Sequence, residues 1–316
     1  MTNAKLVVTP PPHLSRRGTV GGAMRDVTLA LLPVTLVSVY FFRGYALMLV
    51  AVCIVTAVLT ELAFRSLMNR PVSLHDGSAI LTGLFVALLL PPTAAPWTAA
   101  VATFLAIGVA KELMGGLGWN RLNPALFGRV VIILLAPALP FLNHSTMPWA
   151  IDAVSSATPL ALLSQGVAMP SNWELFTAFP GGALAETSPL ALLLGGAYLL
   201  NRRHINWRIP ASMIGTVFVL TAILGQNPIQ HILTGGIMLG AFFMATDWVT
   251  SPINDRGKIA FGVAIGALTV LFRVGLAPTE GVAFSILIMN AFVPLIERLT
   301  KRPSFSEPTA TSKAAG

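Results

Sequence analysis

Apolar stretches long enough to enter a lipid bilayer recur along this chain from residue 27 to residue 299, with no long polar block between them. The hydrocarbon core of a bilayer is about 30 Å thick, and a helix needs roughly 17 to 25 apolar residues to cross it. Only 10% of the residues are charged and 55% are hydrophobic, whereas soluble domains carry about 25% charged residues. The sequence therefore predicts an all-α polytopic protein, embedded in membrane lipid over nearly its whole length.

When the apolar runs are compared with the length that a helix needs to cross a bilayer, they give about ten candidate transmembrane spans. They cover residues 27–42, 44–68, 78–90, 97–113, 130–142, 183–200, 210–224, 232–246, 259–276 and 282–299. Several are short for a full crossing. We expect 78–90 and 232–246 to be broken or tilted helices, which are tolerated where irregular backbone is buried in protein or lines a cavity.

The basic residues predict the orientation of these spans. With both termini placed in the cytoplasm, eighteen of the 20 Lys and Arg fall on the inner side, and only Arg43 and Arg273 fall outside. Cytoplasmic loops carry the excess of Lys and Arg, so we expect a multi-pass membrane protein with both termini on the cytoplasmic side. The longest outer segment is then 143–182, which carries neither Lys nor Arg. The predicted cytoplasmic arm, membrane domain and cytoplasmic tail are residues 1–26, 27–299 and 300–316.

The net charge and the cysteine content exclude several classes of site. A charge of +8 suggests nucleic acid in a soluble protein, but here the basic residues flank apolar segments in runs of at most two, so we expect no nucleic-acid partner. The single cysteine, Cys53, cannot form a disulfide or an iron–sulfur site within this chain. Its simplest interpretation is a small buried apolar side chain. No spacing predicts a metal site or a hydrolytic triad.

Short matches between the two halves indicate an internal repeat. Ile-Leu-Thr-Gly occurs at 80–83 and again at 232–235, and Leu-Ala-Leu-Leu occurs at 29–32 and at 190–193. Because the corresponding spans start on opposite sides of the membrane, we expect a 5+5 inverted repeat. Such repeats place functional sites near the repeat interface, often on discontinuous helices.

The predicted outer loop contains Asp-Ala-Val-Ser-Ser-Ala-Thr at 152–158. This segment resembles the flavinylation motif Asp-x-x-Ser/Thr-Gly/Ser-Ala-Thr, with Ser156 where glycine is commonest. In proteins that bear the motif, a flavin transferase attaches FMN through its phosphate to the hydroxyl of the last threonine, here Thr158. A loop supplies the exposure that this reaction needs. The alternative is a polar turn ended by Pro159. The candidate cofactor-binding residues are Thr158, as the covalent site, with Asp152, Ser155, Ser156 and Ala157.

Five further segments extend the resemblance over nearly the whole chain. In chain order they are LTGLFVALLLPP (81–92), GGLGWNRLNPALFGR (115–129), AETS (185–188), FFMATDWVTSP (242–252) and EGVAF with the following Met-Asn (280–290). Together they resemble the NqrB/RnfD family, which contains a membrane component of the Rnf complex and one of the Na+-translocating NADH:quinone reductase. The short N-terminal arm and the total length are more similar to the Rnf (Rsx) branch.

The resemblance implies a membrane subunit of an ion-translocating electron-transport complex. Complexes of the Rnf type move electrons between reduced ferredoxin and NAD+, coupled to movement of Na+ or H+. The resemblance further implies iron–sulfur subunits and a second flavinylated subunit as partners, an external flavin transferase, and a chain that is not catalytically complete alone. The resemblance also implies a second flavin, a non-covalent riboflavin near the inner side of the membrane. No residue is assigned to this riboflavin.

Intramembrane charges are the first place to look for an ion route, and we name Asp247 and Glu61 as candidates. Glu61 lies one helical turn from Arg65, so the two can simply form an ion pair. Lys111 and Glu112 can pair with neighbouring helices, and we expect both groups to lie near the inner surface, where long side chains reach water. The alternative function is a secondary transporter or channel without a redox cofactor, since inverted repeats with broken helices are used by such proteins.

The glycine and Asn-Pro segment at 115–129 predicts a re-entrant break in the helical chain. Glycine permits close backbone approach and positive φ, Pro124 lacks an N–H donor, and Asn120 and Asn123 can satisfy freed backbone groups. Three roles stay open for this break: holding a flavin ring, lining an ion route, or tight packing of small residues between helices.

Overall fold

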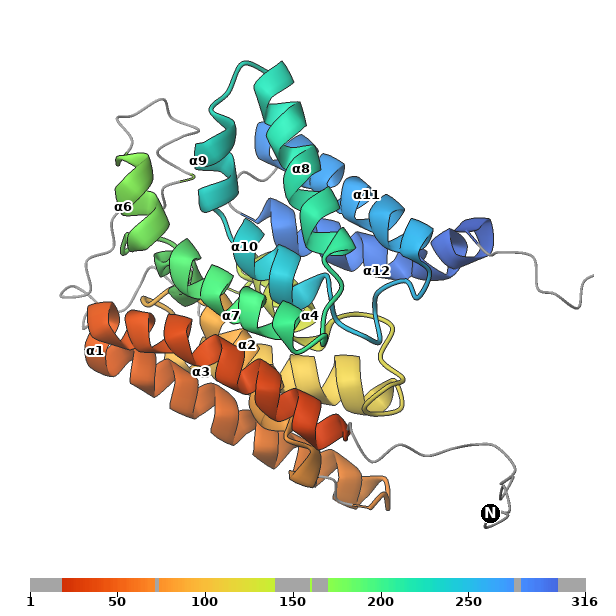
Figure 1. Cartoon of the computed structure of the whole chain (residues 1–316). Helices are drawn as coiled ribbons and strands as arrows, with labels where there is room; N and C mark the ends of the chain where they lie inside the picture. The colour runs from red at the N-terminus through yellow and green to blue at the C-terminus, as the bar shows by residue number, and fades with distance from the viewer. Residues whose placement is uncertain (1–18, 72–73, 140–159, 161–169, 276–279, 301–316) are drawn as a thin grey trace, which may run out of the picture.

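The structure is a computed structural model that describes residues 19–71, 74–139, 160, 170–275 and 280–300. Over these ranges the elements of regular secondary structure are helices (Figure 1), which confirms the predicted all-α class. The first half contains α1 Val20–Leu67, α2 Ser78–Leu89, α3 Pro96–Phe104, the π-helix η2 Leu105–Leu113 and α4 Pro124–Leu135. The second half contains α6 Asn172–Thr177, η6 Leu184–Thr187, α7 Pro189–Asn201, α8 Arg208–Ile223, α9 Pro228–Leu233, α10 Ile237–Leu239, the π-helix η7 Gly240–Met244, α11 Asp255–Gly275 and α12 Gly281–Thr300.

Helix α1 consists of two arms that meet at Arg43. This residue has φ 49° and ψ −126°, which is not helical, and Figure 1 shows the two arms joined at one end. Each arm is about 35 Å long at 1.5 Å per residue, enough to cross a bilayer core. The predicted break at Arg43 between 27–42 and 44–68 is therefore confirmed, and a separate membrane crossing by each arm stays a prediction.

Three helices of the described chain, α1, α11 and α12, are long and apolar enough to cross a membrane. Four shorter apolar helices, α2, α4, α7 and α8, accompany them. These helices support a membrane-embedded protein. The count of ten spans and the 5+5 repeat remain predictions.

The fifth span begins earlier than the sequence indicated. Helix α4 starts at Pro124 and not at residue 130, because Asn123 caps it: the Asn123 side-chain oxygen accepts hydrogen bonds from the N–H groups of Ala125 (3.1 Å) and Leu126 (3.3 Å). Asparagine at the N-cap followed by proline at the first helical position is a strong start signal. The shift places Arg129, expected at the inner boundary, within the helix and buried.

The predicted break in the span 232–246 is confirmed. Helix α9 ends at Leu233, Thr234 is extended, and Gly235 and Gly236 have φ values of 64° and 71° before the chain resumes as α10 and η7. Glycine adopts positive φ at little cost. The corresponding break expected in 78–90 is absent, since α2 is continuous over Ser78–Leu89, and a tilt of this helix stays a prediction.

Small residues allow the helices to approach closely. A Cβ on Gly83 of α2 would lie 2.8 Å from the carbonyl oxygen of Cys53 in α1, and a Cβ on Gly195 of α7 would collide with the carbonyl of Ala30 in α1. Such contacts are typical of membrane helices, where association depends on packing. Cys53 is fully buried at this contact, as its apolar surroundings predicted.

Candidate functional site

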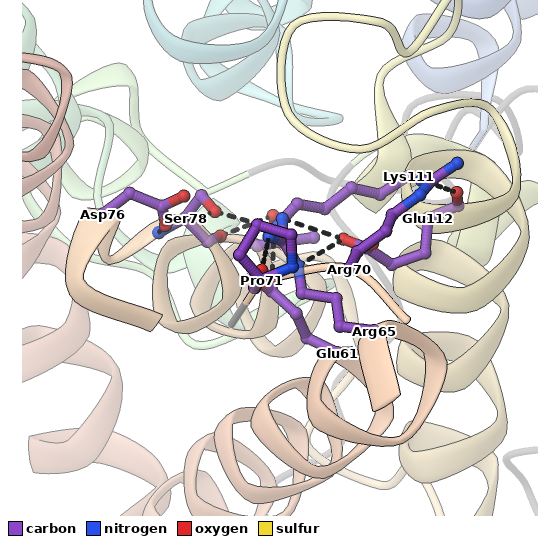
Figure 2. A network of polar contacts seen from close by, with 9 residues as sticks. Glu61, Arg65, Arg70, Pro71, Asp76, Ser78, Lys111 and Glu112 are labelled. Carbon is purple, nitrogen blue, oxygen red and sulfur yellow. Dashed lines mark hydrogen bonds and ion pairs between the residues drawn. The ribbon is translucent and has the colours of Figure 1, made fainter. Parts of the chain in front are cut away.

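A cluster of charged side chains joins α1 to the π-helix η2 (Figure 2). Arg65 Nε lies 3.2 Å from Glu61 Oε1, which confirms the predicted pair one helical turn apart. Lys111 Nζ lies 2.6 Å from Glu61 Oε2 and donates a hydrogen bond of 2.7 Å to Ser78 Oγ at the start of α2. Glu112 Oε1 lies 3.5 Å from Arg65 Nε. The cluster therefore ties three helices together through two carboxylates and two cations.

The cluster is buried between helices, so the expected contact of the long Lys111 and Glu112 side chains with water is not observed, while their position near the inner surface stays a prediction. Lys111 is 1% exposed, and Glu61 and Glu112 are fully buried. An isolated buried charge costs several kcal/mol, whereas paired and hydrogen-bonded charges compensate one another. The predicted pairing of Lys111 and Glu112 with a neighbouring helix is confirmed, because Lys111 pairs with Glu61 and Glu112 lies 3.5 Å from Arg65, both in α1.

A cavity of about 330 Å³ lies beside this cluster, and we call it the Asp247 cavity. Its aromatic wall includes Phe85, Phe242 and Trp248, and its polar wall includes Lys111, Asn120, Asn123 and Asp247. The predicted re-entrant segment thus lines a cavity, with Asn123 capping α4. The cavity brings together the segments 115–129 and 242–252, which the sequence had singled out separately.

The two ion-route candidates lie in different environments. Asp247 lines the cavity, is half-buried, and accepts a hydrogen bond of 2.9 Å from Thr250 Oγ1. Glu61 is held between Arg65 and Lys111. Lys111 links the two regions, since it lines the cavity and pairs with Glu61. Sequence reasoning did not assign Lys111 a site role, because its partners are 33 and 50 residues away.

A second cavity, of about 210 Å³, lies between the two halves, and we call it the Glu186 cavity. Glu186 and the glycines Gly182, Gly235 and Gly236 line it together with the ion pair of Arg129 and Glu280. The ion pair joins α4 to the residue before α12, 151 positions away. Burial of Arg129 is compensated by this partner, which sequence periodicity could not identify.

Arg273 fills the break between α9 and α10. Its guanidinium donates hydrogen bonds to the carbonyl oxygens of His231 (2.6 Å), Thr234 (2.8 Å) and Gly235 (3.2 Å). Unpaired carbonyls at a helix C-terminus carry partial negative charge, so a cation of the chain itself satisfies them. Arg273 was assigned to the outer side, near the end of the predicted span 259–276, and it lies buried in the last turn of α11.

The flavinylation motif lies outside the described residues, so Asp152, Ser155, Ser156, Ala157 and Thr158 keep their status as predictions. The nearest described residue is Leu160, which is buried and lines the Glu186 cavity. Further along the same predicted outer segment, the described residues form α6, which begins with a capping box of Ser171 and Glu174.

Comparison with known proteins identifies a single family of relatives for this chain. A model of the NQR2, RnfD, RnfE family matches residues 7–306. The chain is 41% identical over 308 residues to the D subunit of the Na(+)-translocating ferredoxin:NAD(+) oxidoreductase complex of Acetobacterium woodii, covering 95% of each chain. It is 39% identical over 315 residues to the D subunit of the proton-translocating ferredoxin:NAD(+) oxidoreductase complex of Clostridium ljungdahlii, covering 94% of this chain and 95% of the relative.

A third relative, the D subunit of the ion-translocating oxidoreductase complex of Stutzerimonas stutzeri, is 38% identical over a gapped alignment of 324 positions, which covers 90% of this chain and 92% of the relative. The match to the family model and these full-length similarities agree with the resemblance found in the sequence segments. This chain belongs to the NQR2, RnfD, RnfE family.

Proposed function

We propose that this chain is the FMN-carrying membrane subunit of an ion-translocating electron-transport complex of the Rnf type. Such a complex transfers electrons between ferredoxin and NAD+ and couples the transfer to movement of Na+ or H+. The observation that carries the proposal is similarity over the full length to relatives named as the D subunits of ferredoxin:NAD+ oxidoreductase complexes. Since one of these relatives is named for Na+ and the other for protons, the similarity leaves the coupling ion open.

The redox chemistry of this subunit is proposed to reside in FMN bound covalently to Thr158. In this proposal the chain lies in a bacterial inner membrane, with Thr158 on the outer side and both termini in the cytoplasm. The motif at 152–158 supports this assignment. The remaining centres belong to partners: iron–sulfur subunits and a second flavinylated subunit, with a flavin transferase acting on Thr158. The single cysteine of the chain cannot supply the thiolates of an iron–sulfur cluster, so the cluster ligands are proposed to come from other subunits.

In-gel fluorescence tests the covalent flavin. Protein from cells that contain the transferase, denatured and washed, is expected to fluoresce in a gel, and the peptide spanning Thr158 to carry the mass of FMN. Thr158→Ala is expected to lose both signals, whereas Thr146→Ala, from the same predicted loop, keeps them. Fluorescence that persists in Thr158→Ala would move the attachment to another residue.

The Asp247 cavity is the proposed site of the non-covalent riboflavin. Its volume falls within the roughly 300–1,000 Å³ of small-molecule sites, which combine apolar walls with a few polar groups. Phe85, Phe242 and Trp248 would contact the ring faces, and Asn120 and Lys111 would supply donors to its polar edge. When bound, a flavin supplies one- and two-electron redox chemistry, while the protein supplies position and electrostatic environment.

Flavin extraction tests this second site separately from the first. Acid extraction of purified Thr158→Ala protein is expected to release riboflavin in proportion to protein, measured by chromatography with fluorescence detection. Adding Phe242→Ala is expected to reduce the extracted amount. If Thr158→Ala protein releases no flavin, the cavity does not hold one.

The proposed ion route uses Asp247 rather than Glu61. Asp247 faces a cavity, whereas the charge of Glu61 is neutralised by Arg65 and Lys111. Asp247→Asn is expected to lower ion transport per electron transferred in the purified complex, and Glu61→Gln to lower the amount of folded protein instead. If ion transport per electron is unchanged in Asp247→Asn, Asp247 does not lie on the ion route and its role is structural.

The alternative of a transporter or channel needs a broken helix whose backbone carbonyls are open to an ion. The broken helix is present, but Arg273 donates to the carbonyls of His231, Thr234 and Gly235. This occupancy favours the electron-transport proposal over the transport alternative.

A further inference from the structure

A third cavity, of about 450 Å³, opens at the end of the bundle where α7 ends and α8 and α11 begin. It adjoins the Asp247 cavity, with which it shares His204, Ile205, Thr246 and Trp248, and it differs from that cavity in its cations, Arg203 and Lys258. Its polar and aromatic lining comprises Arg203, His204, Asn206, Trp207, Trp248 and Lys258. We propose that this cavity binds the phosphate headgroup of an anionic phospholipid.

The charge of the cavity favours an anion. Among the described residues that line it, none is acidic. The Arg203 side chain has no hydrogen-bond or ion-pair partner in the described part of the chain. Lys258 Nζ approaches Asp255 only to 4.0 Å, and the same Asp255 oxygen is 3.0 Å from Arg208 Nη1. Arg203 and Lys258 therefore contribute positive charge that the protein leaves largely uncompensated.

Other cations nearby are already paired. Arg202 Nη2 lies 3.0 Å from Asp26 Oδ2, and the same carboxylate oxygen lies 2.6 Å from His204 Nε2. Asp26 thus pairs with Arg202 and with His204, which also lines the cavity, and it leaves Arg203 and Lys258 for a ligand. A phosphodiester would complete the charge balance.

The backbone at Arg203 adds a second observation. Helix α7 ends in a Schellman motif, in which the His204 N–H bonds to the Leu199 carbonyl and the Arg203 N–H bonds to the Leu200 carbonyl, each at 3.0 Å. In this motif the first residue after the helix cap adopts the left-handed conformation and is usually glycine. Here that residue is Arg203, with φ 59°. An arginine is strained there, and strained residues cluster at binding sites, where they are part of the mechanism.

The aromatic rim identifies the source of the phosphate as lipid. Trp207 is 61% exposed and Trp248 is 55% exposed, and exposed tryptophans concentrate at the membrane–water interface, at the level of the headgroups. Trp248 is fixed there because its Nε1–H donates to the His204 carbonyl at 2.6 Å. Basic pockets between membrane helices on the cytoplasmic side bind anionic headgroups, and the orientation predicted from Lys and Arg places the end of α7 and the starts of α8 and α11 on that side.

Lipid titration of the delipidated full-length chain in detergent tests the proposal, with bound lipids counted by native mass spectrometry. Phosphatidylglycerol is expected to bind more tightly than phosphatidylcholine. Arg203→Gly and Lys258→Gln are each expected to weaken phosphatidylglycerol binding about fivefold, the effect of one interfacial cation, and the double variant to remove the preference. Arg256→Gln removes an exposed cation of α11 that does not line the cavity and is expected to bind as the wild type does.

Arg203→Gly also separates binding from folding. Because glycine suits the left-handed position, this variant is expected to melt at or above the wild-type temperature without lipid and to lose part of the stabilisation by phosphatidylglycerol. Equal lipid preference in the double variant and the wild type would overturn the proposal. Inorganic phosphate that raises the melting temperature as much as phosphatidylglycerol does would overturn the assignment to lipid.

Discussion

At the scale of single residues, the molecule depends on charges that are buried in compensating pairs. The pair of Lys111 and Glu61 joins η2 to α1 at 2.6 Å with both side chains out of solvent. Removing one partner of a buried pair leaves an uncompensated charge, whereas replacing both can be nearly neutral. The pair therefore specifies how two helices meet more than it adds to stability.

Glu61→Gln and Lys111→Met test this interpretation. Each single variant is expected to lower the free energy of unfolding by about 3–5 kcal/mol, and the double variant by clearly less than the sum, because the two residues are coupled. Denaturant titration of the purified protein in detergent measures the three values. Additive losses would show that the pair is not coupled.

A second residue, Glu174 at the start of α6, gives a pH dependence outside the membrane-spanning helices. Hydrogen bonds from the Ser171 backbone N–H and hydroxyl hold the pKa of Glu174 below its ordinary value of 4.5. A carboxylate whose pKa is lowered by folding stabilises the native form above the unfolded pKa, and this contribution is lost as the pH falls through the folded pKa.

Hydrogen exchange of α6 is therefore expected to accelerate, relative to its intrinsic rate, when the pH falls below about 4.5. In Glu174→Gln this extra acceleration should be absent, since the amide does not titrate. Hydrogen exchange is measured by mass spectrometry on the peptide that contains residues 171–178, in the wild type and in Glu174→Gln. The same pH profile in both proteins would exclude Glu174 as the titrating group.

At the scale of elements, close helix crossings depend on single glycines. Helix α7 approaches α1 so closely at Gly195 that an added Cβ would collide with the Ala30 carbonyl, whereas Gly215 of α8 has no neighbouring atom within 4 Å. Both are helical glycines in apolar surroundings, so they form a matched pair for substitution.

Gly195→Val is expected to destabilise the protein by about 1–3 kcal/mol, the range for overpacking of a tight contact. Gly215→Val is expected to change stability by less than about 1 kcal/mol, because only helix propensity is altered. Thermal unfolding in detergent compares the two variants. If both lose the same stability, the crossing of α7 and α1 is not set by glycine.

At the scale of the whole molecule, the distribution of Lys and Arg predicts which face lies outside. The single cysteine is buried, so Cys53→Ala gives a cysteine-free background for mapping. In intact cells, Ser164→Cys is expected to react with a membrane-impermeant maleimide, whereas Ser304→Cys reacts only after the cells are opened. Labelling of Ser304→Cys in intact cells would place the C-terminus outside and reverse the topology.

The local features of the fold were predictable from the sequence. Apolar runs identified the membrane helices, Arg43 separated the two arms of α1, glycines marked the break before α10, and the spacing of Glu61 and Arg65 predicted their pair. These features depend on residues within about one helical turn, where periodicity and backbone preference act directly.

The tertiary structure decided which distant residues meet. Lys111 finds Glu61 across 50 positions, Arg129 finds Glu280 across 151, and Arg273 fills a break made 38 to 42 positions earlier. Sequence by itself determined that this chain is a helical membrane protein and where most of its helices bend or end. Only the packing of helices decided which charges are buried, because a buried charge is tolerated only where another helix brings its partner.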